Sequence, residues 1–133
     1  PALVIWQTGT VDAVSGVAPD DFADTLRDGT DIVAATGADL VLVDPQFSRF
    51  LRANADVDTY RNAMIAAGAR QGVSLFRRYE IMQTWAEDGI VDLEATPPDA
   101  REATMRRLNS CLGAALARFI LNGAKATPAA FHP

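Results

Sequence analysis

Four arginines are the first residues of this sequence whose type and spacing could do chemistry. Arg49 and Arg52 follow the apolar run ADLVLVD (38–44), and Arg77 and Arg78 stand near the end of VSLFRRY (73–79). A guanidinium group binds a carboxylate or phosphate through two parallel hydrogen bonds. The group therefore indicates an anion site. The alternative is that these arginines pair with Asp and Glu side chains of neighbouring helices.

Two aspartates also follow apolar runs, namely Asp12 after the first and Asp44 after the second. As functional residues they would line a pocket. As structural residues they would accept hydrogen bonds from backbone N–H groups of a turn or of the next helix. For Asp12 the structural role is favoured, and for Asp44 the two roles stay open.

No residue pattern predicts a metal or cofactor. The one histidine, His132, is the penultimate residue, and the one cysteine, Cys111, falls on the apolar side of the last predicted helix as a small buried hydrophobe. Neither the ligand spacing of a zinc centre nor a D-x-D-x-D-G calcium loop occurs. The sequence also lacks a glycine-rich phosphate loop.

The elements that must position these residues alternate along the chain. Three apolar runs predict buried strands at 2–6, 38–44 and 73–79, and amphipathic helices are predicted between and after them. Strand and helix alternation indicates right-handed crossovers and a parallel sheet. We therefore predict a three-layer α/β/α fold of at least three strands, with sites outside the carboxyl ends of the strands.

The helices are predicted from capping residues and apolar stripes. Asp20 is expected to cap the first helix, which ends at Gly37, and 59–71, 80–89 and 99–123 are the others. Inward-facing apolar residues are expected on the first helix, on 59–71 and on 99–123: Phe22, Leu26, Ile32, Val33, Tyr60, Met64, Ile65, Leu108, Leu112, Leu116 and Phe119.

The composition indicates how many domains the chain forms and which classes of partner are excluded. The 133 residues are 49% hydrophobic and 22% charged, which fits one globular α/β domain at 1–126 with a flexible tail at 127–133. The net charge of −5 argues against a nucleic-acid partner. No apolar run reaches the ~18 residues of a membrane span. Without an initiator Met, Pro1 is expected to be a processed or cut end.

The stretch VIWQTGTVD resembles a block of the SGNH (GDSL-type) hydrolase family that usually reads Gly-x-Asn-Asp at the end of a central strand. Gly9, Thr10, Val11 and Asp12 occupy those four places. In the family the Asn amide belongs to the oxyanion hole, and losing one such donor lowers the rate ~100–1,000-fold. The resemblance implies that Val11 removes this donor and that Asp12 braces the turn.

The stretch RRLNSCLGAALARFI is similar to the final helix of that family, which usually follows an Asp-x-x-His motif with the acid and base of the triad. One register places Arg106 at the Asp and Asn109 at the His, and a shifted register offers Thr104 and Arg107. Neither register supplies an imidazole. The Gly-Asp-Ser block that carries the family's nucleophile is also absent from the sequence. Serine catalysis needs both groups.

The resemblance therefore implies a degenerate serine ester hydrolase without a metal, corresponding to the later part of an SGNH-like domain with flavodoxin-like topology. Its substrate would be a small acylated sugar or lipid, in a bacterial periplasmic or secreted protein. We expect weak activity or none from this chain alone. The first alternative is a non-catalytic domain that binds through the strand-end face or the first strand. A flavodoxin-like domain with a phosphate-sized ligand is the second.

The first predicted strand raises the question of what lies beside it. In the family a strand that bears the nucleophile precedes it, and without that neighbour an apolar strand edge is open to pairing. We expect an upstream segment or a companion chain to complete the sheet, or a homodimer to form through this strand. A third candidate for covering the edge is the tail, 127–133.

Overall fold

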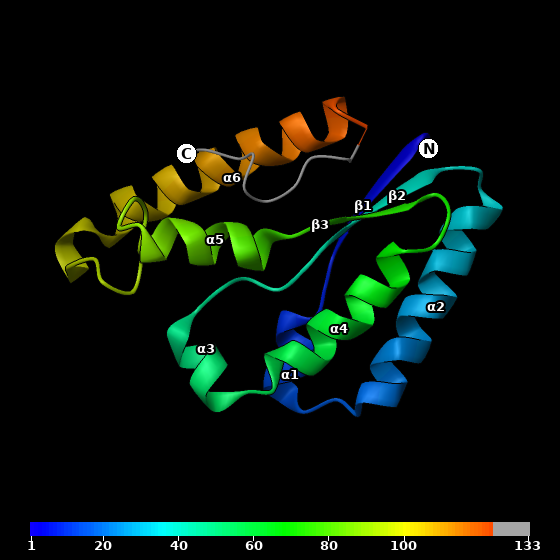
Figure 1. Ribbon diagram of the computed structural model, residues 1–133, viewed down its shortest axis with the longest axis horizontal. Coiled ribbons are helices and arrows are strands. Elements are labelled where there is room, and N and C mark those ends of the chain that lie inside the picture. The colour runs from blue at the N-terminus through cyan, green and yellow to red at the C-terminus, as the bar shows by residue number, and fades with distance from the viewer. Residues whose placement is uncertain (124–133) are drawn as a thin grey trace.

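A three-stranded parallel sheet forms the centre of the computed structural model, which describes residues 1–123. The strands β1 (Leu3–Gln7), β2 (Asp39–Val43) and β3 (Val73–Phe76) lie in the order β1-β2-β3 (Figure 1). In register, Ile5 lies beside Val41, and Val41 lies beside Ser74. The predicted α/β fold with a parallel sheet is confirmed.

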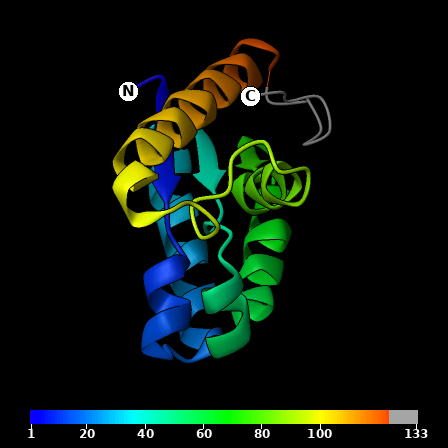
Figure 2. The same cartoon turned by 90° about the vertical axis from the view of Figure 1, so that its left-hand side faces the viewer.

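The helices connect the strands and then leave the sheet. Between β1 and β2 lie α1 (Thr10–Ser15) and α2 (Pro19–Ala35). Between β2 and β3 lie α3 (Arg49–Asn54) and α4 (Val57–Gly68). After β3 come α5 (Arg78–Glu87), a 3₁₀ turn (Pro98–Ala100) and α6 (Arg101–Leu121). Figures 1 and 2 show α6 and the α2–α4 pair on opposite sides of the strands.

Helices α2 and α4 fill one face of the sheet. Side chains of alternate strand positions, including Leu40 and Leu42, pack there with Leu26 of α2 and Met64 of α4, all of them buried. The contact is close enough that a Cβ added to Gly29 would lie 2.5 Å from the ring of Trp6. Glycine at this position therefore allows α2 to approach the sheet.

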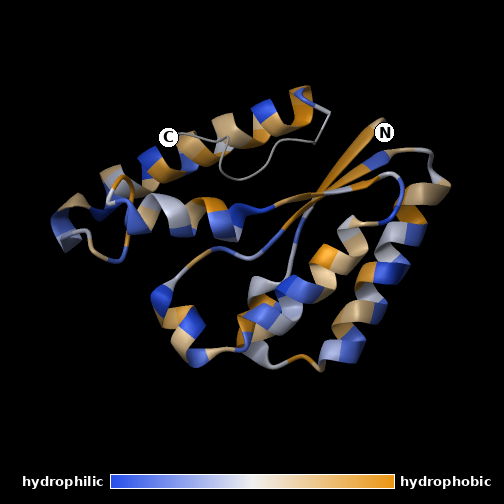
Figure 3. Cartoon of the chain, viewed as in Figure 1, coloured by the Kyte–Doolittle hydropathy of each residue, from blue (hydrophilic) through white to orange (hydrophobic). Residues whose placement is uncertain are grey.

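The opposite face is covered over β2 and β3 but not over β1. Val43 and Phe76 belong to a second buried cluster with Trp85 of α5 and Phe119 of α6, and the rings of Phe76 and Phe119 meet edge to face. The β1 side chains on the same face stay open, with Leu3 37% and Ile5 49% exposed. Figure 3 shows that β1 is nevertheless strongly hydrophobic.

Several predicted boundaries are wrong. Residues 77–79 do not extend the third strand, because Arg78 already begins α5. Helix α2 begins at Pro19, so Asp20 lies in its first turn and does not cap it, and Asp56 caps α4. The short helices α1 and α3 are additional elements.

Most of the expected inward residues are buried or half-buried, but two face solvent: Ile32 is 69% and Ile65 39% exposed. The apolar stripe of α2 is therefore narrower than predicted, and the buried residues of α4 are Val57, Tyr60 and Met64, without Ile65. Cys111 is half-buried. Within residues 1–123, none of the helices combines the length and apolar character that crossing a bilayer requires.

Candidate functional site

The carboxyl ends of β2 and β3 open onto a cavity of about 210 Å³ that α6 closes from the other side. Its wall is mainly apolar, with polar groups from the β2–α3 segment, α5, the loop after α5 and α6. The lining residues are Gln46, Phe47, Ser48, Arg78, Met82, Ala86, Val91, Asp92, Leu93, Glu94, Met105, Leu108, Asn109 and Leu112. This cavity is at the edge of the sheet where the sequence predicted a site.

A second cavity of about 380 Å³ lies between α6 and the end of β1. Ile5 and Gln7 of β1 and Leu116 of α6 are in its wall. Arg78 and Asn109 line both cavities, as does Leu112. The two spaces therefore meet at one arginine and one asparagine, beside the open part of the sheet.

Arg78 is the one arginine of the predicted group that faces these cavities. Its Nε donates a hydrogen bond to the backbone oxygen of Asp44 at 3.0 Å. Within the part of the chain that the structure describes, no carboxylate forms an ion pair with it. Burial lowers the pKa of its guanidinium, and the Asp44 charge opposes that effect. Arg78 is thus a partly buried cation held by a neutral acceptor.

The other three arginines differ from Arg78. Arg49 pairs with Asp92 at 2.8 Å, and Arg77 pairs with Glu80 at 2.5 Å. Arg52 is exposed on α3. Pairing with acidic neighbours, the alternative considered for this group, therefore holds for two of the four.

Asp44 supports the site from beneath. Its side chain is 1% exposed, and its Oδ1 accepts a hydrogen bond from the backbone N–H of Tyr79 at 2.9 Å. Its Oδ2 has no hydrogen bond and lies 3.7 Å from Nε of Arg61, whose guanidinium covers the Tyr79 ring. Burial raises the pKa of Asp44 to about 6, against the effects of the Tyr79 N–H and Arg61. Asp44 therefore positions the start of α5 and does not line either cavity.

The turn after β1 is tightly built. Gly9 has φ 103°, a conformation that favours glycine, and a Cβ there would come within 3.1 Å of Pro45. Asp12 accepts hydrogen bonds through Oδ2 from the Gly9 N–H at 3.3 Å and from the Thr8 hydroxyl at 3.4 Å. Asp12 thus braces the turn, which was the favoured role.

This turn is linked to the first cavity. The backbone N–H of Gln46, a lining residue, donates to the Thr10 hydroxyl oxygen at 3.4 Å. The Val11 side chain is 75% exposed and carries no hydrogen-bond donor. The place that the resemblance assigns to an oxyanion donor therefore holds an exposed alkyl side chain, which lines neither cavity.

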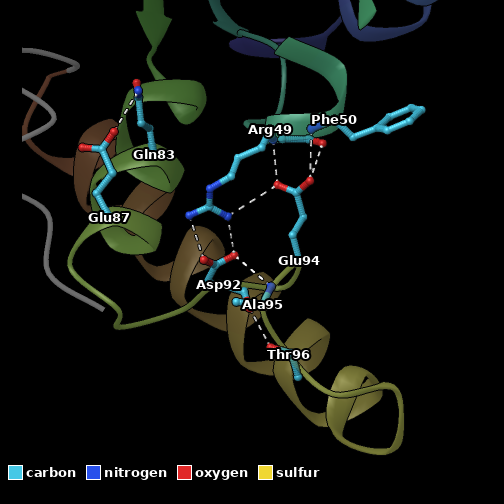
Figure 4. Close-up of polar contacts among 9 residues, drawn as sticks. Arg49, Phe50, Gln83, Glu87, Asp92, Glu94, Ala95 and Thr96 are labelled. Atoms are coloured by element: carbon cyan, nitrogen blue, oxygen red, sulfur yellow. Dashed lines mark hydrogen bonds and ion pairs between the residues drawn. The ribbon is translucent and has the colours of Figure 1, made fainter. Parts of the chain in front are cut away.

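Asp92 and Glu94, two acidic residues that sequence reasoning missed, line the first cavity, and Figure 4 shows their contacts with the start of α3. Glu94 accepts hydrogen bonds from the backbone N–H groups of Arg49 at 2.7 Å and Phe50 at 3.1 Å, and from the Ser48 hydroxyl at 3.2 Å. Asp92 accepts one from the Arg49 guanidinium at 3.0 Å. The available signal was the acid-rich segment 87–94, which includes the end of the predicted helix at 80–89 and the residues after it.

These contacts set the pKa values of both acids. The Arg49 hydrogen bond lowers the pKa of Asp92. Burial alone would raise the pKa of Glu94, but the two N–H donors, the Ser48 hydroxyl and the Arg49 charge together lower it. Both carboxylates are therefore held in their charged form and tie the loop after α5 to the start of α3.

Of the two residues assigned to the acid and base positions, only Asn109 lines the cavities. Asn109 is exposed on α6 and lines both cavities. Arg106 lines neither and pairs with Glu102 one turn earlier on α6, at 2.7 Å. His132 and the predicted tail at 127–133 lie outside the described residues. Among residues 1–123, no group of three or more His, Cys, Asp or Glu side chains could hold a metal ion.

The fold and these cavities define a parallel α/β domain with a site at the carboxyl ends of its strands. The sequence matches the family described as non-GDSL lipase-like over residues 1–126, and the chain belongs to that family. This match confirms the predicted lipase-like relationship. In the comparisons with curated proteins and with solved structures, no match to this chain was found.

Proposed function

We propose that this chain is a lipase-like ester hydrolase domain in which catalysis is weak or absent without further polypeptide. The observation that carries the proposal is the turn at Gly9–Asp12, which Asp12 braces and the Gln46–Thr10 hydrogen bond joins to the cavity wall, while Val11 offers no donor. An oxyanion hole acts through preorganised donors. Without the amide, a developing oxyanion would have one stabilising group fewer.

The groups around the first cavity also make a poor nucleophile and base. Ser48 is the serine in its wall, and its hydroxyl donates to Glu94. A serine needs a base that can take its proton, and a carboxylate with a lowered pKa is a weak one. Asn109, at the place assigned to the base, cannot exchange a proton near neutral pH. The pair Ser48 and Glu94 is better explained as the cap that joins α3 to the loop.

The test is hydrolysis of a short-chain ester, p-nitrophenyl butyrate, by the purified chain. We expect the rate to equal that of Ser48→Ala, with Ser110→Ala, an exposed serine outside both cavities, as the matched control. Hydrolysis that Ser48→Ala abolishes and Ser110→Ala leaves intact would overturn the proposal, because Ser48 would then be the nucleophile.

The assigned register has its own test. In a longer polypeptide that contains a Gly-Asp-Ser block, Arg106→Asp combined with Asn109→His should create measurable esterase activity. No gain there would show that the register is wrong, because Arg106 and Asn109 would not occupy the places of the acid and base.

The alternative function is binding through β1, and the open edge favours it. The strand has no charged residue, and Leu3 and Ile5 are exposed on the α6 side of the sheet, where α6 covers β2 and β3 but not β1. Charged side chains are a usual protection of sheet edges. In this alternative, a strand from an upstream segment or from a companion chain pairs with β1. The second possible arrangement is a homodimer in which the β1 strands of two copies pair. The mass of the isolated chain in solution tests the homodimer.

A further inference from the structure

The position of Arg78 calls for an anion that the described residues do not supply. Its guanidinium is half-buried, borders both cavities and has a backbone oxygen as its hydrogen-bond partner. The Asp44 charge acts on Arg78, but no described carboxylate lies within ion-pair distance of the guanidinium. A partly desolvated cation without a paired anion is unfavourable, and a ligand that pairs with it binds more tightly for that reason. Arg52 and Arg101, which also have no ion pair with any residue that the structure describes, are exposed, so solvent compensates their charge.

The walls around Arg78 restrict the anion further. Phe47, Met82 and Leu108 make the first cavity apolar beyond the guanidinium, so the ligand needs an apolar part. Asp92 and Glu94 stand in the same wall as charged carboxylates. A doubly charged phosphate would meet stronger repulsion from these acids than a singly charged group.

We propose that Arg78, with Asn109 beside it, binds the carboxylate of a small monocarboxylic acid whose short apolar chain occupies the first cavity. Guanidinium and carboxylate match in geometry, and the Asn109 amide can donate a further hydrogen bond. The inference rests on the proposed function only for the location at the strand-end face, because binding a carboxylate requires no hydrolysis.

Calorimetry with octanoate, and with octan-1-ol as its neutral counterpart, tests this. Octanoate should bind the unaltered chain with a clearly lower Kd than octan-1-ol. Arg78→Met should raise the Kd for octanoate by about tenfold or more, the size of a charge-assisted hydrogen bond. The Kd for octan-1-ol should not change. Arg52→Met, at the exposed arginine, is the matched control.

Asn109→Asp decides the matter if Arg78→Met fails to fold, since Asn109 is exposed on α6. A carboxylate there would pair with Arg78 and repel the ligand, so octanoate binding should fall by about tenfold or more. Ser110→Asp adds the same charge one residue away, outside both cavities, and should leave the Kd unchanged.

Absence of octanoate binding, or equal binding of octanoate and octan-1-ol, would overturn the inference. Equal losses in Asn109→Asp and Ser110→Asp would also overturn it, because the effect would then be long-range charge. These outcomes are separate from failure of the proposed function, which is measured by ester turnover and by Ser48→Ala.

Discussion

The two faces of the sheet differ in how completely helices cover them. On the face covered by α2 and α4, Leu26, Leu40 and Met64 are almost fully buried, and Gly29 lets the helix touch the Trp6 ring. On the face covered by α6, the core ends at β2, and Ile5 of β1 borders a cavity. The same strand is thus packed on one side and open on the other.

Because of this difference, we assign stability mainly to the first face of the sheet and binding to the second. On the filled face, α2 packs directly against β1 at the contact between Gly29 and Trp6. The α6 face has the two cavities, the exposed strand edge and Arg78, which has no ion pair with the described residues. We therefore expect substitutions on the first face to change the free energy of unfolding, and those on the second to change binding and association.

The largest contrast should come from truncating one apolar residue on each face. Leu26→Ala should lower the free energy of unfolding by about 2–5 kcal/mol, because it removes buried contacts and leaves a cavity. Ile5→Ala, at a side chain already 49% exposed, should lower it by well under half of that. Urea denaturation followed by circular dichroism measures both. Equal losses would remove the distinction between the faces.

The second contrast concerns pH and the buried Asp44. Its folded pKa of about 6 lies above the ordinary 3.8, so the folded state holds its proton at a higher pH than the unfolded state does. Its contribution to stability therefore falls as pH rises from about 4 to 6, by at most about 3 kcal/mol. Asp92 and Glu94, whose pKa values are lowered, lose their contribution below their ordinary range.

Thermal unfolding between pH 4 and 7.5 measures this. The unaltered chain should be more stable near pH 5 than at pH 7, and Asp44→Asn should flatten the curve. Asp39→Asn, at an exposed acid on β2, is the control that should keep it. A curve that rises steadily from pH 5 to 7 in the unaltered chain contradicts the assignment.

A smaller contrast compares two helix glycines. Gly29→Ala should destabilise by about 1–3 kcal/mol, because the added Cβ overlaps the Trp6 ring. Gly113→Ala on α6 has no heavy atom within 4 Å of the new Cβ and should stabilise by up to about 1 kcal/mol through helix propensity. Denaturant midpoints measure both changes. The comparison fails if the two substitutions shift stability in the same direction.

The smallest effect on folding should come from the open edge. Ile5→Lys places a charge on an exposed strand and should change the free energy of unfolding little, while abolishing any homodimer through β1. Light scattering coupled to size exclusion measures the mass of both forms. A dimer that persists in Ile5→Lys would place the contact elsewhere. An unaltered chain that is monomeric would leave pairing with another segment or chain as the only form of the β1 proposal.

The elements that could be predicted are those with one dominant signal. The apolar runs before Gln7, Asp44 and Arg77 identified three parallel strands and hence the edge where the site lies. The helices α1 and α3 are too short to show a helical pattern of apolar residues, so they were not predicted. Arg77 and Arg78 were assigned to the third strand because no capping residue marks the start of α5.

In the site, contacts between residues close in sequence could be predicted, and ion pairs between residues far apart in sequence could not. The brace from Asp12 to Gly9 spans three residues and could be predicted. The contact between Arg49 and Asp92 spans 43 residues, so the sequence alone did not show that Arg49 is paired while Arg78, which lines the cavities, has no ion pair among residues 1–123.

The most direct test of the central claim, that the strand-end face lacks a working nucleophile in this chain, is the intact mass after treatment with a fluorophosphonate. Such probes phosphonylate an activated serine. The account predicts that the mass of the 133-residue chain stays unchanged. A single adduct mapped to Ser48 would contradict it, and would show that the Ser48–Glu94 contact activates the hydroxyl instead of capping α3.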